Sequence, residues 1–459
     1  MLLKTKVNRF STNLRRCYTK VTYPSVRLSE RTEPQLSAKG RVMSVNSFSQ
    51  DDAAALALLI QAARRVGSTS RPELQRVTGL SRTLATKYID IAIESNLLVE
   101  GNFGTSTGGR APRLLTFNAA AGAILLAELG ASGMSIGLSD LSGNLTELVE
   151  IENDIGIGPE KILLIVEKAF DRIIAKTKFK IWGIGIGLPG PVEFATGIPM
   201  SPPIMPGWDR YPVRSRLSEK YGVPVWVDND VNLMALGEVG KKTEKKYKDL
   251  IYVKMGSGIG AGLLTHGQLH RGAQGCAGDI GHIAVAEATK IVCRCGNVGC
   301  LEAMAGGLAI ARDALVAGES GESKFLKARL KTTKKITARD VIDGAQSGDK
   351  WCVDSITAAG QHVGKILATL VNFHNPSLVV IGGGVSAAGD QLLASIRETV
   401  LRRSLPLATR DLEIRLGQSA DATGLRGAAE MVISELFAPS TLMQWVGIGH
   451  PDSFLEHQS

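Results

Sequence analysis

Residues 275–302 read GCAGDIGHIAVAEATKIVCRCGNVGCLE and carry the most distinctive residue pattern of the chain. Cys293, Cys295 and Cys300 are three of its six cysteines, and His282 precedes them by eleven residues. Three thiolates and one imidazole make a complete tetrahedral ligand set for Zn²⁺, with no open position for catalysis. The pattern therefore predicts a structural zinc ion; the alternative is three buried thiols beside a core histidine.

Length and composition limit the classes of protein to which the chain can belong. The chain has 459 residues, of which 44% are hydrophobic and 21% charged, which is typical of a globular protein of two to three domains. No apolar run approaches the ~20 residues of a membrane-spanning helix. The sparse cysteines suit a reducing cytoplasm, and Cys276 is expected to serve packing. We expect a cytoplasmic protein with no membrane partner.

The net charge of +9 comes almost entirely from one end. Residues 1–45 hold ten Lys and Arg against two Glu, which leaves +1 for the remainder. This tail fits a basic nucleic-acid arm, a transit peptide, or a disordered or misassigned start with Met43 as initiator. We expect the last of these for residues 1–50, because the organised pattern begins at Asp51.

Residues 51–118 have the signals of a winged helix-turn-helix domain. A first helix spans 51–65; Ser70 caps a second with Glu73 three residues on, and Ser81 caps a third after a turn at Gly79. In the third helix, Leu84 and Tyr88 are expected to face inward. Outward-facing residues that suit phosphates and base edges are Arg82, Thr83, Thr86 and Lys87.

Two strands around a glycine-rich loop follow and predict the wing, with Arg110 at its tip for the DNA backbone or minor groove. The alternative for this domain is a small helical protein-interaction module.

From residue 119 the chain alternates strands and helices, which predicts an α/β fold. Polar and glycine residues gather where strands end, the place at which such folds bind ligands. They include Asp228-Asn229-Asp230, Gly256 to Gly262, and Gly382-Gly383-Gly384. Two hairpin openings near 122 and 249 suggest two similar lobes. We expect a small lobe at 119–232, a large lobe with the zinc loop at 233–437, and a tail at 438–459.

Between Asp51 and Pro439 the chain resembles the ROK family of repressors, open reading frames and kinases. The resemblance rests on TGLSR, STGGRAP, GIGLPGPV, VDNDVN, GSGIGAG, AGDIGH, the Cys-x-Cys-Gly-x₃-Cys-Leu-Glu run and NPSLVVIGGGVS, in that order. It implies a two-lobed, actin-like sugar-kinase domain, preceded in the regulator branch by a winged helix.

The resemblance also implies roles. In the family's kinases the residue at Asp230 is the base that deprotonates the sugar, and a sugar site would consist of Asn229, Asp230, Asp279, His282 and Glu302. The nucleotide would lie against Gly130, Gly256, Ser257, Gly258, Gly260, Gly382, Gly383 and Gly384. His282 would serve both the sugar and the zinc ion.

Departures from the kinase pattern argue against catalysis. The phosphate motif Asp-x-Gly-Gly-Thr is replaced by Glu128-Leu129-Gly130-Ala131-Ser132. Ile204 stands where kinases usually have a sugar-binding Asn, and Asp279 replaces a Glu. Misplacement of reacting groups by about 1 Å can cost ~100-fold in rate.

Three hypotheses follow. The first is a sugar-responsive DNA-binding regulator, a repressor acting on an operator as a homodimer or homotetramer, with a sugar or phosphosugar effector. The second is an ATP- and Mg²⁺-dependent hexose or N-acetylhexosamine kinase with an attached DNA-binding domain. The third is a sugar-sensing adaptor that binds a protein partner.

Overall fold

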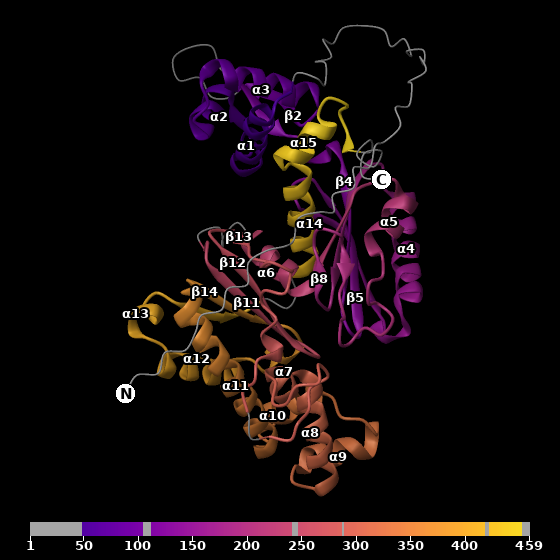
Figure 1. The fold of residues 1–459 in the computed structure, drawn as a ribbon, viewed down its shortest axis with the longest axis vertical. Coiled ribbons are helices and arrows are strands. Elements are labelled where there is room, and N and C mark those ends of the chain that lie inside the picture. Colours follow the sequence, from indigo (N-terminus) through magenta and orange to yellow (C-terminus); the bar gives the residue numbers. More distant parts are fainter. Residues whose placement is uncertain (1–47, 104–111, 241–246, 287–288, 418–421, 452–459) are drawn as a thin grey trace, which may run out of the picture. The chain divides into compact units, whose positions relative to one another are not determined.

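The computed structural model describes residues 48–103, 112–240, 247–286, 289–417 and 422–451 (Figure 1). The chain divides into Met1–Val42 and a compact unit Met43–Ser459. The first of these, which holds most of the basic tail, lies outside the described residues. Within them, no helix has both the length and the apolar character needed to cross a membrane.

The N-terminal domain is a winged helix. Its elements are α1 (Gln50–Val66), β1 (Thr69–Ser70), α2 (Arg71–Thr78), α3 (Arg82–Glu94), β2 (Leu98–Phe103) and β3 (Arg113–Phe117), with strand order β1-β3-β2. Ser70 and Ser81 accept hydrogen bonds from backbone N–H groups of α2 and α3, and Gly79 ends α2 in the left-handed region at φ 69°. These capping interactions satisfy helix-end donors, as the sequence predicts.

The third helix buries Ala85, Tyr88, Ile89 and Ala92. The expectation that Leu84 faces inward is wrong, since its side chain is 41% exposed. In the first turn of α3 the residue that reaches the core is instead the adjacent Ala85.

The first sheet has the order β10-β7-β4-β5-β6. Its strands are β4 (Ala123–Leu129), β5 (Gly133–Asp140), β6 (Leu145–Glu152), β7 (Ile181–Leu188) and β10 (Val225–Asn229). The first three pair antiparallel, whereas β7 and β10 join in parallel. A small hairpin, β8 (Val192–Glu193) and β9 (Ile198–Pro199), follows β7.

The second sheet repeats this plan in the order β13-β12-β11-β14-β15. Its strands are β11 (Leu250–Met255), β12 (Ile259–Thr265), β13 (Gln268–Leu269), β14 (Leu378–Gly382) and β15 (Glu413–Leu416). Again an antiparallel meander is extended by two parallel strands. The two hairpin openings seen in the sequence therefore start two lobes of the same topology.

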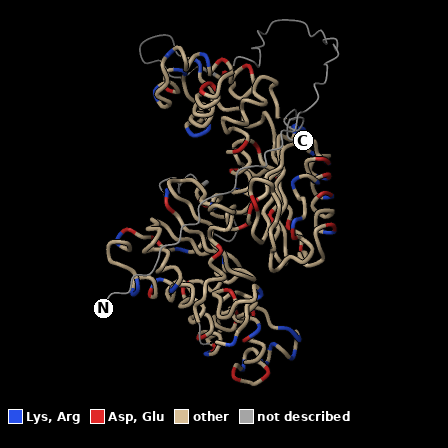
Figure 2. The backbone as a smooth tube through the Cα atoms, in the orientation of Figure 1, with Lys and Arg blue, Asp and Glu red and all other residues tan. Residues whose placement is uncertain are grey.

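Helices cover both sheets (Figure 1). They are α4 (Pro159–Lys176), α5 (Val213–Tyr221), α6 (Asp230–Gly240), α7 (Leu301–Ala305), α8 (Gly307–Ser320), α9 (Lys324–Thr333), α10 (Ala338–Gln346), α11 (Lys350–His374), α12 (Asp390–Arg403), α13 (Pro406–Thr409), α14 (Thr423–Leu436) and α15 (Pro439–Trp445). Charged residues of both signs recur along α4 (Figure 2).

Helices α6 and α14 lie in close contact with each other. A Cβ atom on Gly427 of α14 would stand 1.7 Å from the carbonyl oxygen of Leu233 on α6, and one on Gly237 would stand 1.9 Å from that of Thr423. Only glycine permits such an approach of two backbones. Although α14 lies inside the range expected for the large lobe, it packs against β4 and β7 of the first sheet.

The C-terminal residues were expected to form a tail, but 439–445 are helix α15, whose Trp445 is fully buried. One apolar core joins this helix to the winged helix and the first lobe. Its members include Leu56, Tyr88, Phe117, Leu126, Trp182, Val432 and Trp445. No polar pattern in the sequence marks α15, because what fixes it is burial of aromatic side chains against distant segments.

Candidate functional site

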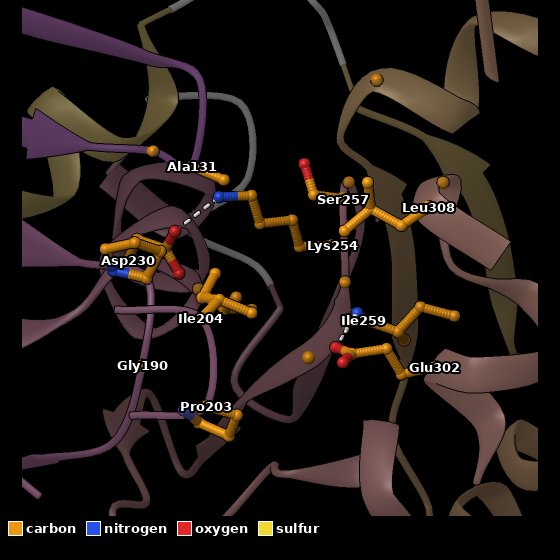
Figure 3. A pocket seen from close by; sticks show the side chains of 18 of the residues that line it. Ala131, Gly190, Pro203, Ile204, Asp230, Lys254, Ser257, Ile259, Glu302 and Leu308 are labelled. Carbon is orange, nitrogen blue, oxygen red and sulfur yellow. Dashed lines mark hydrogen bonds and ion pairs between the residues drawn. The ribbon is translucent and has the colours of Figure 1, made fainter. Parts of the chain in front are cut away.

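A cavity of about 760 Å³ is lined by residues from both lobes (Figure 3). One wall comes from the turn 130–133, the loop 189–191 and the start of α6. The other comes from the loop 256–261, the segment 275–282 and the start of α8. A cavity of this size holds a small polar molecule. Among the predicted residues it brings together are Gly130, Asn229, Asp230, Gly256, Ser257, Gly258, Gly260, Asp279, His282, Glu302 and Gly384.

The polar residues at the end of β10 are held by their own neighbours. Asp228 is buried and accepts a hydrogen bond from Arg271 Nε at 2.7 Å and another from Asn232 Nδ2 at 2.9 Å. Asn229 Nδ2 donates to the carbonyl of Gly190, and its Oδ1 accepts from Val231 N–H, both at 2.9 Å. These bonds tie the loop 189–191 to the start of α6 and leave Asp230 at the cavity wall.

Asp230 is paired with Lys254, a residue that the sequence reading did not single out. Lys254 Nζ lies 2.5 Å from Asp230 Oδ2, and the two side chains are 20% and 3% exposed. Figure 3 shows the lysine extending from β11 toward Asp230. Burial lowers the pKa of Lys254, but Asp230 and Glu128 outweigh burial and leave this pKa above its usual value.

Glu128 stands behind this pair, on β4. Burial, opposed by Lys254 and reinforced by Asp230, raises the pKa of the Glu128 carboxyl to about 7. Its carboxylate lies against α14, where a Cβ on Gly424 would be 2.1 Å from Glu128 Oε2.

Asp279, His282 and Glu302 line the other side of the cavity. Burial, opposed by His282, raises the pKa of Asp279, whose Oδ1 lies 3.8 Å from His282 Nε2. Glu302 Oε2 accepts a hydrogen bond from the N–H of Ile259 at 3.1 Å. The remaining oxygens of these acids are acceptors that suit the hydroxyl groups of a sugar.

His282 also belongs to a second cluster. The ligand atoms of His282, Cys293, Cys295 and Cys300 all lie within 4.8 Å of one another. His282 Nδ1 is 3.5 Å from Cys293 Sγ, and Cys295 Sγ is 3.7 Å from Cys300 Sγ. Isolated bridges between Ala284 and Cys300 and between Val292 and Val298 fold the loop back on itself. The four residues therefore form a group able to hold a metal ion.

The glycine loops differ in what they do. Gly256, Ser257, Gly258 and Gly260 line the cavity, and so does Gly384. Gly382 and Gly383 do not. A Cβ on Gly382 would meet the Tyr252 hydroxyl at 2.0 Å, and Gly383 has φ +85° against the backbone of Met255. These two glycines allow the end of β14 to lie close to Tyr252 and to the backbone of Met255.

Cys276 is placed differently from expectation, whereas Ile204 is placed as expected. Cys276, expected to serve packing, is exposed and lines the cavity. Ile204 also lines it, so the position at which kinases usually carry an asparagine presents an apolar side chain. The importance of Lys254 could have been predicted from the sequence. It is the only charged residue in the otherwise apolar strand 250–255, and a buried charge requires an oppositely charged partner.

On the winged helix, Arg82, Thr83, Thr86 and Lys87 are all exposed. Lys87, however, forms a close ion pair with the buried carboxylate of Asp52, which also accepts a hydrogen bond from the Tyr88 hydroxyl at 2.7 Å. Its ammonium therefore stabilises the domain. Arg110 lies outside the described residues.

Comparison with known proteins agrees with this architecture. The model of the ROK family matches residues 125–435. A xylose repressor of Caldicellulosiruptor bescii is 32% identical over 373 residues, covering 80% of this chain and 92% of that protein. A glucokinase of Halalkalibacterium halodurans is 31% identical over 308 residues, covering 66% of this chain and 93% of that enzyme.

Solved structures give the same result. A ROK family transcriptional regulator, described as a homolog of the E. coli MLC protein, has a TM-score of 0.75 at 25% identity and covers 87% of this chain and 100% of its own. A Streptomyces griseus ROK family glucokinase, in complex with glucose and AMPPNP, has a TM-score of 0.57 at 26% identity, covering 68% and 99%. Since the family model alone spans most of both lobes, the chain belongs to the ROK family.

Proposed function

We propose that the chain is a sugar-responsive DNA-binding transcriptional repressor that uses a degenerate sugar-kinase cleft as its sensor. The observation that carries this proposal is the shared apolar core of the winged helix, α15 and the first lobe. The similarity to a xylose repressor supports it. The alignment covers 80% of this chain, which is a longer stretch than the two lobes together. That alignment therefore extends into the winged helix.

The DNA contacts are assigned to the exposed N-terminal part of α3. Arg82, Thr83 and Thr86 present donors and acceptors there, the end of a recognition helix that enters the major groove. Arg110 of the wing is proposed as a backbone or minor-groove contact. A homodimer would place two such domains on the half-sites of a palindromic operator.

The sugar is assigned to the cavity end that holds Asn229, Asp230, Asp279, His282 and Glu302. Three carboxylates, an amide and an imidazole offer acceptors and donors for several hydroxyl groups. Xylose and glucose are the first effectors to test, because repressors and kinases similar to this chain are named for them. We place the protein in the cytoplasm, where an operator is accessible.

The metal is assigned as one structural Zn²⁺ held by His282, Cys293, Cys295 and Cys300. In a tetrahedral site with Zn–S bonds of ~2.3 Å, sulfur atoms stand ~3.8 Å apart. The Cys295–Cys300 separation of 3.7 Å fits this value. Because His282 Nε2 faces Asp279 on the cavity side, the ion would fix the orientation of a sugar-binding residue.

A kinase remains the second candidate, and one observation favours it. Asp230 stands at the cavity wall beside a glycine loop whose backbone suits phosphates. ATP and Mg²⁺ would be needed, with Asp230 as base. A panel of sugars with ATP–Mg²⁺ decides the matter: turnover above that of the D230N variant supports the kinase, and equal rates exclude it.

The experiment that tests the repressor is fluorescence anisotropy of labelled DNA from the region upstream of the chain's own gene and its neighbours. We expect saturable binding to one palindromic segment, together with a change in affinity when xylose or glucose is added. If no neighbouring segment is bound more tightly than random DNA of the same length, the proposal is wrong.

A further inference from the structure

The ion pair between Asp230 and Lys254 joins the two lobes across the cavity. Asp230 is the first residue of α6 and follows β10 of the first sheet, whereas Lys254 belongs to β11 of the second. Lys254 Nζ and Asp230 Oδ2 are 2.5 Å apart, and the Asp230 side chain is almost fully shielded from solvent. Nothing in the residue roles implied by the kinase family places a lysine here.

The carboxylates near this lysine outnumber it. Asp230 from α6 bonds it directly, and Glu128 from β4 interacts with it electrostatically. Burial, aided by Glu238, Glu128 and Asp230 and opposed by Arg415, raises the pKa of Tyr252 on the same strand. Like charges in a poorly solvated site oppose double ionisation, and an ammonium bonded to one of the two carboxylates offsets their repulsion.

In phosphoryl transfer that cation is supplied from outside. Magnesium ions bound to the nucleotide neutralise charge around the transferring group, and the base must be free to take a proton. Here the cation is a covalent part of the protein, and it already occupies one oxygen of the would-be base. An ammonium bonded to this oxygen occupies the position from which a base would accept the proton of a sugar hydroxyl.

We propose that Lys254 is the built-in counter-cation of the sugar site, which lets the cleft bind an uncharged sugar without nucleotide or divalent metal and keeps Asp230 as a hydrogen-bond acceptor instead of a base. This inference rests on the proposed sensor function and deepens it. It also predicts which class of effector binds. The cavity holds three carboxylates, and the ammonium of Lys254 is already paired with one of them, so a neutral sugar is favoured over a negatively charged phosphosugar.

The test is calorimetric titration of the full chain with xylose and glucose, each alone, with Mg²⁺, and with Mg²⁺ and a nonhydrolysable ATP analogue. We expect the wild-type dissociation constant to be the same in all three conditions. Tighter sugar binding in the presence of the metal and nucleotide overturns the inference. Absence of sugar binding in every condition defeats the sensor function itself, so the two failures are distinguishable.

The variant K254M removes the charge and keeps much of the volume. We expect sugar affinity to fall about 10-fold or more. Without the ammonium, Asp230 and Glu128 repel each other, so one of the two carboxyl groups is protonated or displaced. The pH dependence of sugar affinity between about pH 6 and pH 8 should differ between K254M and wild type, because Glu128, whose pKa is about 7, loses the cation that opposes its protonation. The double variant E128Q/K254M should regain affinity, since the competing carboxylate is gone.

A purely structural lysine predicts another pattern: K254M would lower thermal stability but leave the affinity and its pH profile unchanged in the folded fraction. That result overturns the inference, and so does a double variant no better than K254M. If K254M does not fold, the conservative variant K254R replaces it. The inference is supported if wild-type sugar affinity does not depend on Mg²⁺ or nucleotide and K254R binds the sugar as tightly as wild type. It is overturned if K254R loses sugar affinity although it keeps the positive charge.

Discussion

The rings of Trp182 and Trp445 pack edge to face, with centroids 5.2 Å apart and planes at 68°. Trp182 begins the buried part of β7 in the first lobe, and Trp445 ends α15, close to the C-terminus. Trp445 Nε1 also donates to the carbonyl of Leu436 at 3.0 Å, so the buried indole has its polar partner. The last helix is therefore fixed to the first lobe.

Removing the Trp445 side chain should destabilise the protein strongly. W445A empties a site that is fully buried, and truncations of this kind cost about 3–5 kcal/mol. Chemical denaturation followed by fluorescence measures the loss. M443A is the matched control on the same helix, because that side chain is 37% exposed. If both variants unfold at the same denaturant concentration, α15 does not contribute to the core.

Two cations of α3 should separate DNA binding from folding. Arg82 is exposed and has no side-chain partner among the described residues, so R82A should weaken operator binding by about 1–3 kcal/mol and leave stability within about 0.5 kcal/mol. K87A should destabilise the domain instead, because it leaves Asp52 without its cation. Anisotropy and thermal unfolding of both variants check this; the reverse assignment would contradict it.

Acid should remove the contribution of Asp52. Its hydrogen bond from Lys87, opposed by burial and aided by Ser49 and Tyr88, holds the pKa of Asp52 well below its usual value. The folded protein therefore binds fewer protons than the unfolded chain, so this stabilisation is complete above about pH 4 and is lost as pH falls toward the lowered pKa. The acid-induced loss of stability should be smaller in K87A than in wild type.

Glu128 should have the opposite effect. Its folded pKa of about 7 lies above the ordinary glutamate value of 4.5, so the folded state holds an extra proton between these values and loses stability as pH rises through them. E128Q cannot ionise, and we expect it to be more stable than wild type by about 1–3 kcal/mol near pH 8, with little difference near pH 4. Denaturant titrations at both pH values check this. A variant that is less stable at pH 8 would falsify the assignment.

Metal removal should weaken sugar binding through His282, which belongs to both the metal cluster and the cavity wall. We expect one equivalent of zinc per chain, reduced in C300S, and a lower sugar affinity because His282 loses its anchor. Metal analysis and calorimetry measure the two effects. C352S is the control, since Cys352 is buried in the α10–α11 region, away from the cluster. Protein purified without chelator that contains no zinc would contradict the prediction.

The glycine contact of α6 and α14 should resist substitution. G427A forces a Cβ to within 1.7 Å of the Leu233 carbonyl, so the helices must separate, at about 1–3 kcal/mol or more. We expect a lower midpoint of unfolding and a smaller effect of sugar on operator affinity. G101A is the control, because its Cβ meets only the Leu114 carbonyl at 3.8 Å. Equal stability of the two variants would show that the contact is dispensable.

The features that the sequence predicts well are local. Ser70, Gly79 and Ser81 define the helix-turn-helix through hydrogen bonds within a few residues. Likewise, Cys293 to Cys300 converge through one tight loop. The lobes are recognisable because hydrophobic strands and glycine turns recur in a known order.

The features that sequence reasoning misses depend on partners far apart in the chain. A lysine in the apolar strand 250–255 shows that a partner exists, but not that it is Asp230. Gly382 leaves space for the Tyr252 hydroxyl, a packing contact that the glycine run itself does not reveal. Helix α14 returns to the first sheet after the whole second lobe, and no local propensity records where a helix docks.

The common core of the winged helix, the first lobe and α15 has a consequence for protein engineering. Leu56, Leu126 and Trp445 exclude water together, so the DNA-reading part is not an interchangeable module attached by a linker. Grafting another reading head onto this sensor would expose apolar surface on both sides of the joint. Chimeras should succeed only when residues 439–445 and the facing side of β4 are transplanted with the head.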